Sequence, residues 1–380
     1  MKDRLLPSAE AHDLLDLTIE LAERELAPRA ATGEADAEFP ADLFGVLGQA
    51  GLLSLPYPEQ LGGGGQPYEV YLQVLEELAA RWLTVALGTS VHVLSCYPVV
   101  AWGTQAQQER WLPRMLGGQT LGAYCLSEPH SGSDAAALST RAVRDGDEYR
   151  VTGTKAWITH AGVADFYNLM VRTGEPGPKG ISCLVTDAQT PGLSIAPPEH
   201  KMGMNASPTA QVILDDARVD AADLVGAEGD GFRIAMAALD SGRLGIAACS
   251  VGLARAALDT AVSYARQRQA FGQAIAGFQG LQFLLADMDT QVHAARALLL
   301  EAARLKDAGR PFSIPAARAK LLASDAAMRV TTDAVQVLGG AGYTTDYPVE
   351  RYMREAKVLQ IVEGTNQVQR MVIGRALAGK

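Results

Sequence analysis

The spacing of apolar residues in the first third of the chain is that of helices. Between residues 9 and 28 they recur at about every 3.6 positions, which predicts an amphipathic helix there. The same spacing predicts helices over 41–51, 67–83, 85–102 and 105–116. Four consecutive glycines, Gly62 to Gly65, indicate a loop between the second and third of these helices, where positive φ angles are tolerated.

The pattern changes near Leu121, where short runs rich in β-branched and aromatic residues replace the helical spacing. They are separated by turn-forming pairs such as Asp145-Gly146 and cover 148–152, 166–171, 180–186 and 209–214. Strands that follow one another without intervening helices predict an antiparallel sheet and argue against a parallel nucleotide-binding sheet.

Helical spacing returns after Gly231 and persists over 232–269, 279–306, 315–338 and 347–359. Four helices joined by short loops indicate a bundle. The predicted fold is therefore α+β and mainly α. It consists of an N-terminal helical domain (1–120), a middle antiparallel β domain of sandwich or barrel type (121–230) and a C-terminal four-helix bundle (231–380).

The segment from Trp82 to Gln108 contains no Asp, Glu, Lys or Arg and is long enough to cross a membrane. However, a membrane span needs about 20 predominantly apolar residues, and this segment carries Ser90, His92, Ser95 and other polar side chains. We therefore expect a buried helix of a soluble protein. Residues 1–7 lack an apolar stretch followed by a small-residue cleavage site, so no signal peptide is predicted.

Composition excludes several classes of protein. The 380 residues are 48% hydrophobic and 20% charged, which is typical of a globular chain of two or three domains. Acidic residues outnumber basic ones by 43 to 33, the reverse of what nucleic-acid or anionic-membrane binding favours. The four cysteines form no CxxC pair, so we expect neither disulfides nor a metal site. A reducing compartment is expected, either the cytoplasm or an organelle matrix.

Known nucleotide-binding fingerprints are missing from the sequence. No GxGxxG motif follows a predicted strand, and no P-loop motif is present. The glycine-rich stretch 226–231 precedes a helix but lacks the P-loop lysine, which favours a tight turn.

Three short segments have compositions that could carry chemistry. The Tyr124–Asp134 segment is dense in hydroxyl and backbone N–H groups, which suits an anionic or carbonyl-rich ligand, although a solvated turn has the same composition. Ala156–Thr159 places Trp157 beside a β-branched hydroxyl at the end of a predicted strand, a pattern that alone is more typical of a core. Glu363 follows two β-branched apolar residues that would raise its pKa and suit a general base, whereas an exposed helix-start Glu is the commoner explanation.

Together and in this order, these segments resemble the acyl-CoA dehydrogenase family of flavoproteins. Two further matches are Arg268-Gln269-Ala270-Phe271-Gly272 and the run from Gln336 to Tyr343, and the resemblance extends from Leu55 to Arg375. It implies the helix–β–helix fold and FAD held without a dinucleotide fingerprint. It also implies an acyl-CoA substrate, an electron-transferring flavoprotein as electron acceptor, and a homotetramer built as a dimer of dimers.

The resemblance also implies roles for individual residues. Glu363 would be the base that removes the α-proton while a β-hydride passes to flavin N5. Within one subunit, FAD would contact Tyr124, Leu126, Ser127, Ser133, Trp157, Ile158, Thr159, Thr365 and Gln367. A neighbouring subunit would contribute Arg268, Phe271, Gln279, Gln336, Gly339 and Gly340. Acyl-CoA would contact Ser133, Asp240, Arg243, Gly364 and Arg375. A purely structural Asp240–Arg243 pair is an equally good interpretation.

The chain departs from the family pattern at three positions. Some members carry the base on the first bundle helix, where this chain has Gly242, so Glu363 is the remaining candidate. Val362 stands where many straight-chain enzymes have an aromatic residue. Ala270 stands where a Thr is frequent, which removes one possible FAD contact.

The predicted function is FAD-dependent dehydrogenation of an acyl-CoA to the trans-2-enoyl-CoA. Alternatives are a flavin oxidase that uses O2, a dehydrogenase of acyl-carrier-protein thioesters, and a catalytically silent flavoprotein that binds a partner. The family places the acyl tail beside Trp82–Trp102, and no Arg or Lys lies between residues 82 and 108 to pair with a second carboxylate. We therefore expect a monocarboxylyl chain of short to medium length, and neither nucleic acid nor a membrane as partner.

Overall fold

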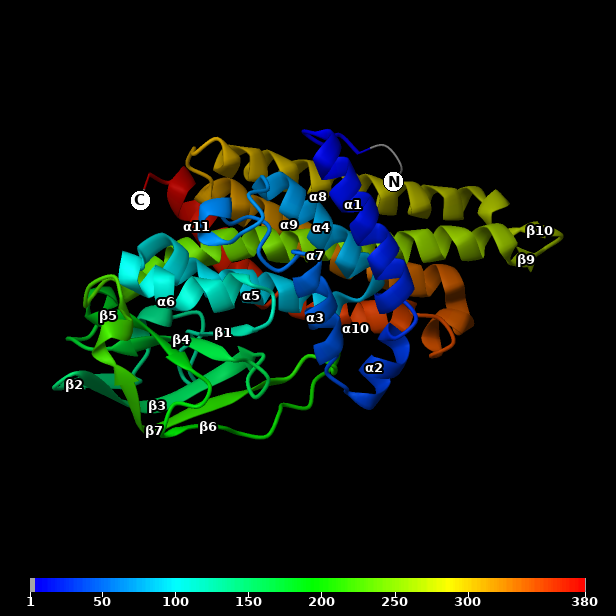
Figure 1. Cartoon of the computed structure of the whole chain (residues 1–380). Helices are drawn as coiled ribbons and strands as arrows, with labels where there is room; N and C mark the ends of the chain where they lie inside the picture. Colours follow the sequence, from blue (N-terminus) through cyan, green and yellow to red (C-terminus); the bar gives the residue numbers. More distant parts are fainter. Residues whose placement is uncertain (1–3, 380) are drawn as a thin grey trace.

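A computed structural model describes residues 4–379 of the chain (Figure 1). Its first part contains the helices α1 (Ala9–Leu21), α2 (Ala30–Asp36), α3 (Ala41–Gln49), α4 (Tyr68–Arg81), α5 (Leu83–Trp102) and α6 (Gln105–Leu116). The helix predicted over 9–28 is shorter, because α1 passes into a π-helical turn, Ala22–Leu26. The sequence did not predict α2, which is only seven residues long.

Two helices, α5 and α7 (Gly231–Gln267), are long and apolar enough to cross a membrane by length and composition. The apolar windows of these helices are 89% and 78% buried inside the folded chain. Both helices are therefore core elements, as the sequence predicted for the Trp82–Gln108 segment.

One eight-stranded sheet forms the middle part of the fold. Its strands are β1 (Gly122–Cys125), β2 (Arg141–Asp145), β3 (Glu148–Thr159), β4 (Phe166–Arg172), β5 (Ile181–Asp187), β6 (Leu193–Ile195), β7 (Thr209–Asp220) and β8 (Leu224–Val225). They pair in the order β6-β7-β3-β2-β4-β5-β8, with β1 beside β4. The prediction of a purely antiparallel sheet is wrong in one respect, since β1 and β2 both run parallel to β4. The Gly122 N–H at the start of β1 donates to His92 of α5 at 3.1 Å, which joins the sheet to the first helical part.

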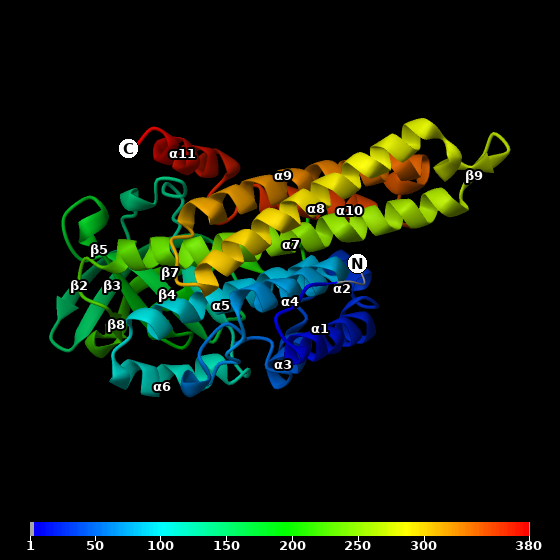
Figure 2. The same ribbon diagram turned by 90° about the horizontal axis from the view of Figure 1, so that it is seen from above.

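The last part of the chain is a helical bundle. After α7, a small hairpin of β9 (Gln269–Ala270) and β10 (Gln273–Ala274) leads to α8 (Gln279–Asp307), α9 (Ser313–Leu338), α10 (Val349–Leu359) and α11 (Asn366–Leu377). Figures 1 and 2 show α7, α8 and α9 side by side, with the hairpin at one end and α11 at the other. The fold class is confirmed, although α11 was not predicted as a helix. The domain boundaries stay predictions.

Small residues on α7 allow it to pack closely against the first helical part. A Cβ atom on Gly252 would lie 2.3 Å from the Glu76 carbonyl oxygen of α4, and one on Gly245 would lie 2.1 Å from the Ser90 hydroxyl of α5. Glycine at these positions therefore brings α7 against both helices. The same helix carries Gly242, where the candidate site begins.

Candidate active site

Glu363 lies in the turn between α10 and α11. Its backbone has φ of 51°, and Gly364 follows with φ of 87°. The residue as a whole is half-buried, but both carboxylate oxygens are buried and have no hydrogen-bond partner among the described residues. Burial raises the pKa of Glu363 to about 7, against the opposing effect of Lys320 and Arg243. An exposed helix-start Glu is therefore excluded, and Thr365 caps α11 instead.

The carboxylate of Glu363 lies directly against Gly242 of α7. A Cβ atom built on Gly242 would come within 1.8 Å of Oε2 and 2.7 Å of Cδ of Glu363. Any side chain at position 242 would therefore occupy the volume that the carboxylate fills. The two positions at which the family resemblance allows a base, 242 and 363, thus meet at one point in this fold.

Asp240 and Arg243 form an ion pair one turn apart on α7. Arg243 Nη1 donates to Asp240 Oδ1 at 2.5 Å, and the Ser313 hydroxyl donates to the same oxygen at 3.0 Å. Arg243 Nε is buried without a partner in the described chain. The ion pair of the structural interpretation is thus present, and the Nε–H of Arg243 is left without a partner within residues 4–379.

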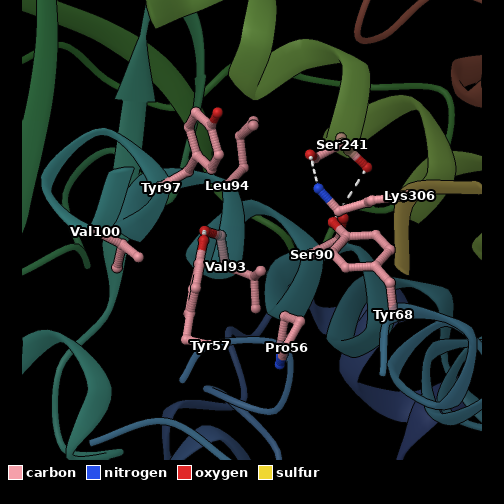
Figure 3. A pocket seen from close by; sticks show the side chains of 11 residues that line it. Pro56, Tyr57, Tyr68, Ser90, Val93, Leu94, Tyr97, Val100, Ser241 and Lys306 are labelled. Carbon is pink, nitrogen blue, oxygen red and sulfur yellow. Dashed lines mark hydrogen bonds between the residues drawn. The ribbon is translucent and has the colours of Figure 1, made fainter. Parts of the chain in front are cut away.

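A cavity of about 180 Å³ opens beside Gly242, between α4, α5 and α7 (Figure 3). Three tyrosines, Tyr57, Tyr68 and Tyr97, line it together with aliphatic side chains of α5. Lys306 reaches it from the end of α8, where its Nζ donates to the Ser241 hydroxyl at 2.8 Å. The same Nζ lies 4.4 Å from the centre of the Tyr68 ring.

Lys306 corrects the argument that no cation lies near the acyl tail to pair with a second carboxylate of the substrate. The segment 82–108 does lack Arg and Lys, but a cation from a distant helix lines the same cavity. Burial lowers the pKa of Lys306 to about 8. No local pattern in the sequence marks this residue, because it sits about two hundred residues beyond α5 in an ordinary amphipathic helix.

Strand ends of the sheet place a second group of predicted residues together. Trp157 has φ of 63° and is 63% exposed, although it is a large aromatic residue. The Ala156 N–H donates to the Ser127 carbonyl at 2.9 Å, so the loop after β1 lies beside the end of β3. The Tyr124 hydroxyl of β1 is buried without a partner in the described chain. The exposed aromatic face of Trp157 suits a flat ring system.

Other predicted residues near these strands differ in exposure. Thr159 ends β3 and is half-buried, and Ser133 is exposed. Leu126 and Ile158 are buried at 8% and 2% exposure, so only their backbone groups can face a ligand.

A buried ion pair that the sequence analysis missed anchors the loop after β1. Lys155 Nζ donates to Glu128 Oε1 at 2.7 Å and to the Leu126 carbonyl at 3.2 Å. Glu128 also accepts the Ser139 and Thr140 N–H groups. Although burial opposes ionisation, Lys155 and these donors lower the pKa of Glu128 to about 2. This arrangement fixes the backbone of residues 126–128.

A third group of predicted residues lies far from Glu363. Arg268 follows Gly242 by 26 residues (268 minus 242) along α7 and its end, a distance of about 39 Å at the helical rise of about 1.5 Å per residue. Phe271 is 95% exposed and lies in the turn between β9 and β10, the hairpin labelled in Figure 1. Other exposed residues predicted for the neighbouring subunit's FAD are Gln279, Gln336, Gly339 and Gly340. One chain thus does not bring these residues to its own Glu363.

The remaining predicted residues belong to the turn before α11 and to α11 itself. Thr365 caps the helix by accepting the Val368 N–H at 3.3 Å. Gln367 and Arg375 are exposed on α11.

Models of a known family match the chain in three successive parts. The N-terminal domain of acyl-CoA dehydrogenases matches residues 8–119, the middle domain 123–217 and the C-terminal domain 229–378. The chain is 44% identical over 362 residues to an acyl-CoA dehydrogenase of Bacillus subtilis, covering 95% of this chain and 96% of the relative. It is 42% identical over 356 residues to a short-chain-specific acyl-CoA dehydrogenase of Clostridium acetobutylicum, covering 93% and 94%.

Solved structures show the same relationship. Butyryl-CoA dehydrogenase from Megasphaera elsdenii superposes with a TM-score of 0.96 at 41% identity, over the whole of both chains. A chain in a structure described for the electron transferring flavoprotein of Acidaminococcus fermentans superposes with a TM-score of 0.97 at 42% identity, again over both whole chains. The resemblance found in the sequence is confirmed, and the chain belongs to the acyl-CoA dehydrogenase family of flavoprotein enzymes.

Proposed function

We propose that this enzyme oxidises a short-chain acyl-CoA to the trans-2-enoyl-CoA, with Glu363 as the base. The observation that carries the proposal is the buried, unpartnered carboxylate of Glu363 beside a cavity of acyl size. A pKa of about 7 suits a base that works near neutral pH, because a large fraction of the carboxyl group is then ionised and the ionised form still binds a proton strongly.

The reaction needs the α-proton of a thioester, which is only weakly acidic. Glu363 would take this proton on a carboxylate oxygen, and the electron pair of the broken C–H bond would enter the new double bond. Negative charge builds on the thioester oxygen during this step. The backbone N–H of Glu363 has no acceptor within residues 4–379 and is free to donate to that oxygen.

FAD fits the group of residues at the strand ends. Trp157 offers an exposed ring face, and Ser127 and Thr159 offer polar groups at the same end of β3, which the Ala156–Ser127 hydrogen bond ties to the loop after β1. Tyr124, whose hydroxyl is buried, is proposed as a contact from β1. Bound FAD would supply the acceptor for the β-hydride. Leu126, Ile158, Ser133, Thr365 and Gln367 are proposed as further contacts.

We propose that a second subunit completes the FAD site. Arg268 and Phe271 are exposed at the far end of α7, together with the other residues assigned to the adenosine part, so they are available to a neighbour. This arrangement supports a dimer at least, and the homotetramer expected from the family. An electron-transferring flavoprotein is proposed as the acceptor, supported by the similar chain in the Acidaminococcus fermentans structure.

The cavity supports a short acyl chain. A cavity of about 150 Å³ is large enough to hold a benzene molecule, so about 180 Å³ suits an acyl tail of similar size, although Lys306 and three tyrosines also line this cavity. The Clostridium relative is named as short-chain specific, and the Megasphaera structure is of a butyryl-CoA dehydrogenase. Asp240, Arg243, Ser133, Gly364 and Arg375 are proposed to contact the CoA thioester.

All four cysteines are free and buried, which supports action in a reducing compartment, the cytoplasm or an organelle matrix.

Anaerobic flavin bleaching tests the proposal. Purified wild-type protein and Glu363→Gln are mixed rapidly with acetyl-, butyryl-, hexanoyl-, octanoyl- and glutaryl-CoA. The wild type should bleach fastest with butyryl-CoA, and Glu363→Gln should bind FAD but bleach at least about 100-fold more slowly, as expected for a lost general base. A loss below about tenfold would refute the role of Glu363. Rapid reoxidation of the bleached enzyme by O2 would instead favour the oxidase alternative.

A further inference from the structure

The turn that carries Glu363 has a backbone that must be held in place. Two successive residues, Glu363 and Gly364, have left-handed φ values of 51° and 87°. For a residue with a Cβ atom, this conformation costs about 1–2 kcal/mol. Such a conformation persists only where the surrounding contacts enforce it.

Helix α9 supplies these contacts through one buried face. Lys320 has no exposed surface, and its Nζ donates to the Gly364 carbonyl at 3.0 Å and to Asn366 Oδ1 at 2.8 Å. Asn366 in turn donates to Asp325 Oδ1 at 2.7 Å and to the Ser324 hydroxyl at 2.9 Å. The carbonyl next to the base and the first residue of α11 are thus tied to one helix.

The ammonium group of Lys320 has no carboxylate within ion-pair distance among residues 4–379, and its two acceptors are neutral oxygens. Among charged groups, Glu363 has the largest effect in raising the pKa of Lys320, although burial lowers that pKa overall to about 8. Conversely, Lys320 is the first of the charges that lower the pKa of Glu363. The two buried groups therefore stabilise each other's charged forms.

We propose that Lys320 is a positioning residue for the base: it fixes the Glu363–Gly364 turn by hydrogen bonds, and its charge favours the ionised carboxylate. The inference rests on the proposed function of Glu363. Lys320 does not line the cavity, and its hydrogen bonds go to the turn that carries Glu363, so its effect on the reaction passes through Glu363.

Several other groups face the same carboxylate and are kept constant in the test. They are Arg243 and Cys249 of α7, Tyr68 and Tyr71 of α4, and Tyr124 of β1. Asp325 also acts on Lys320. None of them is changed by a substitution at Lys320.

Two substitutions weigh the hydrogen bonds against the charge. Lys320→Met removes both, whereas Lys320→Gln removes the charge and keeps an N–H donor, on a side chain one bond shorter, that can reach the Gly364 carbonyl after a small shift. Arg318→Met is the matched control, since Arg318 is an exposed cation on the same helix two residues earlier. Each holoenzyme is tested for FAD content, for the pH dependence of the limiting rate of flavin reduction by butyryl-CoA, and for hydrogen–deuterium exchange of the peptide spanning residues 361–368.

Loss of the positive charge should raise the pKa of Glu363 in both Lys320 variants. The limb over which the rate increases with pH should move to higher pH. If the limb moves by about one pH unit, the rate at a fixed pH on its acid side falls about tenfold, because about a tenth as much of the base is then ionised. Butyryl-CoA affinity should change little. Exchange of residues 361–368 should be faster in Lys320→Met and close to wild type in Lys320→Gln. Arg318→Met should match the wild type throughout.

Two results would overturn the proposal. A pH limb in Lys320→Gln that coincides with the wild type would remove the electrostatic role, and this variant decides the matter if Lys320→Met does not fold. Unchanged exchange in a folded Lys320→Met would remove the positioning role. Failure of the proposed function is seen separately, because Glu363→Gln would then retain rapid flavin reduction whatever the Lys320 variants do.

Discussion

Replacing Gly242 by Ala tests how closely α7 packs against the proposed base. The new Cβ would lie 1.8 Å from Oε2 of Glu363, whereas ordinary contact begins at 3.4 Å. The oxygen must therefore retreat by about 1.6 Å, the difference between these two distances. The backbone of Glu363 cannot follow freely, since its neighbour Gly364 is hydrogen-bonded to Lys320. The side chain has to rotate away from its present position.

The expected loss of rate follows from this displacement. A misplacement of about 1 Å in a reacting group can cost about 10²-fold in rate, so we expect flavin reduction by butyryl-CoA to slow by about 100-fold or more. The fold should survive, because Ala is favoured over Gly in a helix interior by up to about 1 kcal/mol. FAD content and the thermal midpoint of unfolding should therefore stay near the wild-type values while the stopped-flow reduction rate falls.

A matched control is Gly374→Ala in α11, where a Cβ would meet nothing within 4 Å. It should leave the reduction rate unchanged. If Gly242→Ala reduced its flavin at the wild-type rate, the carboxylate would not lie where the structure places it. Moving the base is the complementary experiment: in a Glu363→Gly background the obstruction is gone, so Gly242→Glu should recover part of the activity, whereas the same change in wild type should not.

Three other measurements test separate parts of the site. The kcat/KM of the wild type should rise with pH through about 7, because protonated Glu363 cannot accept a proton. Initial rates measured over a range of pH give this profile. A rise centred near pH 4.5, the ordinary pKa of a solvated Glu, would show that the base is not desolvated. Arg268→Ala should lower FAD content without unfolding the chain, and a monomer on size-exclusion chromatography that binds FAD as tightly as wild type would contradict the cross-subunit site. Lys155→Met should leave Glu128 buried and unpaired, destabilising the chain by about 3–5 kcal/mol in denaturant unfolding and lowering FAD retention, whereas unchanged stability would contradict the anchoring role.

Helices with a long, regular apolar period were predictable from the sequence, and those without one were not. The apolar periods of α4, α7, α8 and α9 are sustained over many turns, so their existence followed from spacing. Helix α5 is apolar on nearly all sides, and its length without charged residues marked it instead. The seven residues of α2 are too few to show a period. For α11 the available signal was Thr365 as a helix cap, and it was interpreted only as a ligand contact.

Strand β3 shows a second reason why the sequence did not predict the whole fold. The sequence predicted 148–152, but the strand continues to Thr159. Register shifts between Val151 and Gly153 and between Lys155 and Ile158 interrupt its pairing with β7. Such irregularities break the alternation of apolar and polar residues that marks a strand, so the sequence predicted 148–152 and a strand end at 156–159 but did not join them into one strand.

Some of the residues around Glu363 were likewise predictable from the sequence, and others were not. Glu363 was found because its own neighbours in the sequence form a recognisable segment. Lys306 and Lys320 were missed because each is a single lysine within an amphipathic helix, a place where lysines are usually solvated. Only packing of α8 and α9 against α7 brings them to the site, and sequence spacing contains no information on that packing.

The structural role of Gly242 could not be deduced from the sequence alone. A glycine within a long helix is normally a cost, yet here it leaves the volume in which the Glu363 carboxylate lies. A second carboxylate at position 242 would compete for that volume. Even with room for both, two like charges in a buried site would raise each other's pKa, and one would stay protonated and inactive as a base near neutral pH. The fold therefore has room for a carboxylate on α7 or on the turn before α11, but not on both, and the absence of a side chain at 242 leaves the volume that the proposed base, Glu363, occupies.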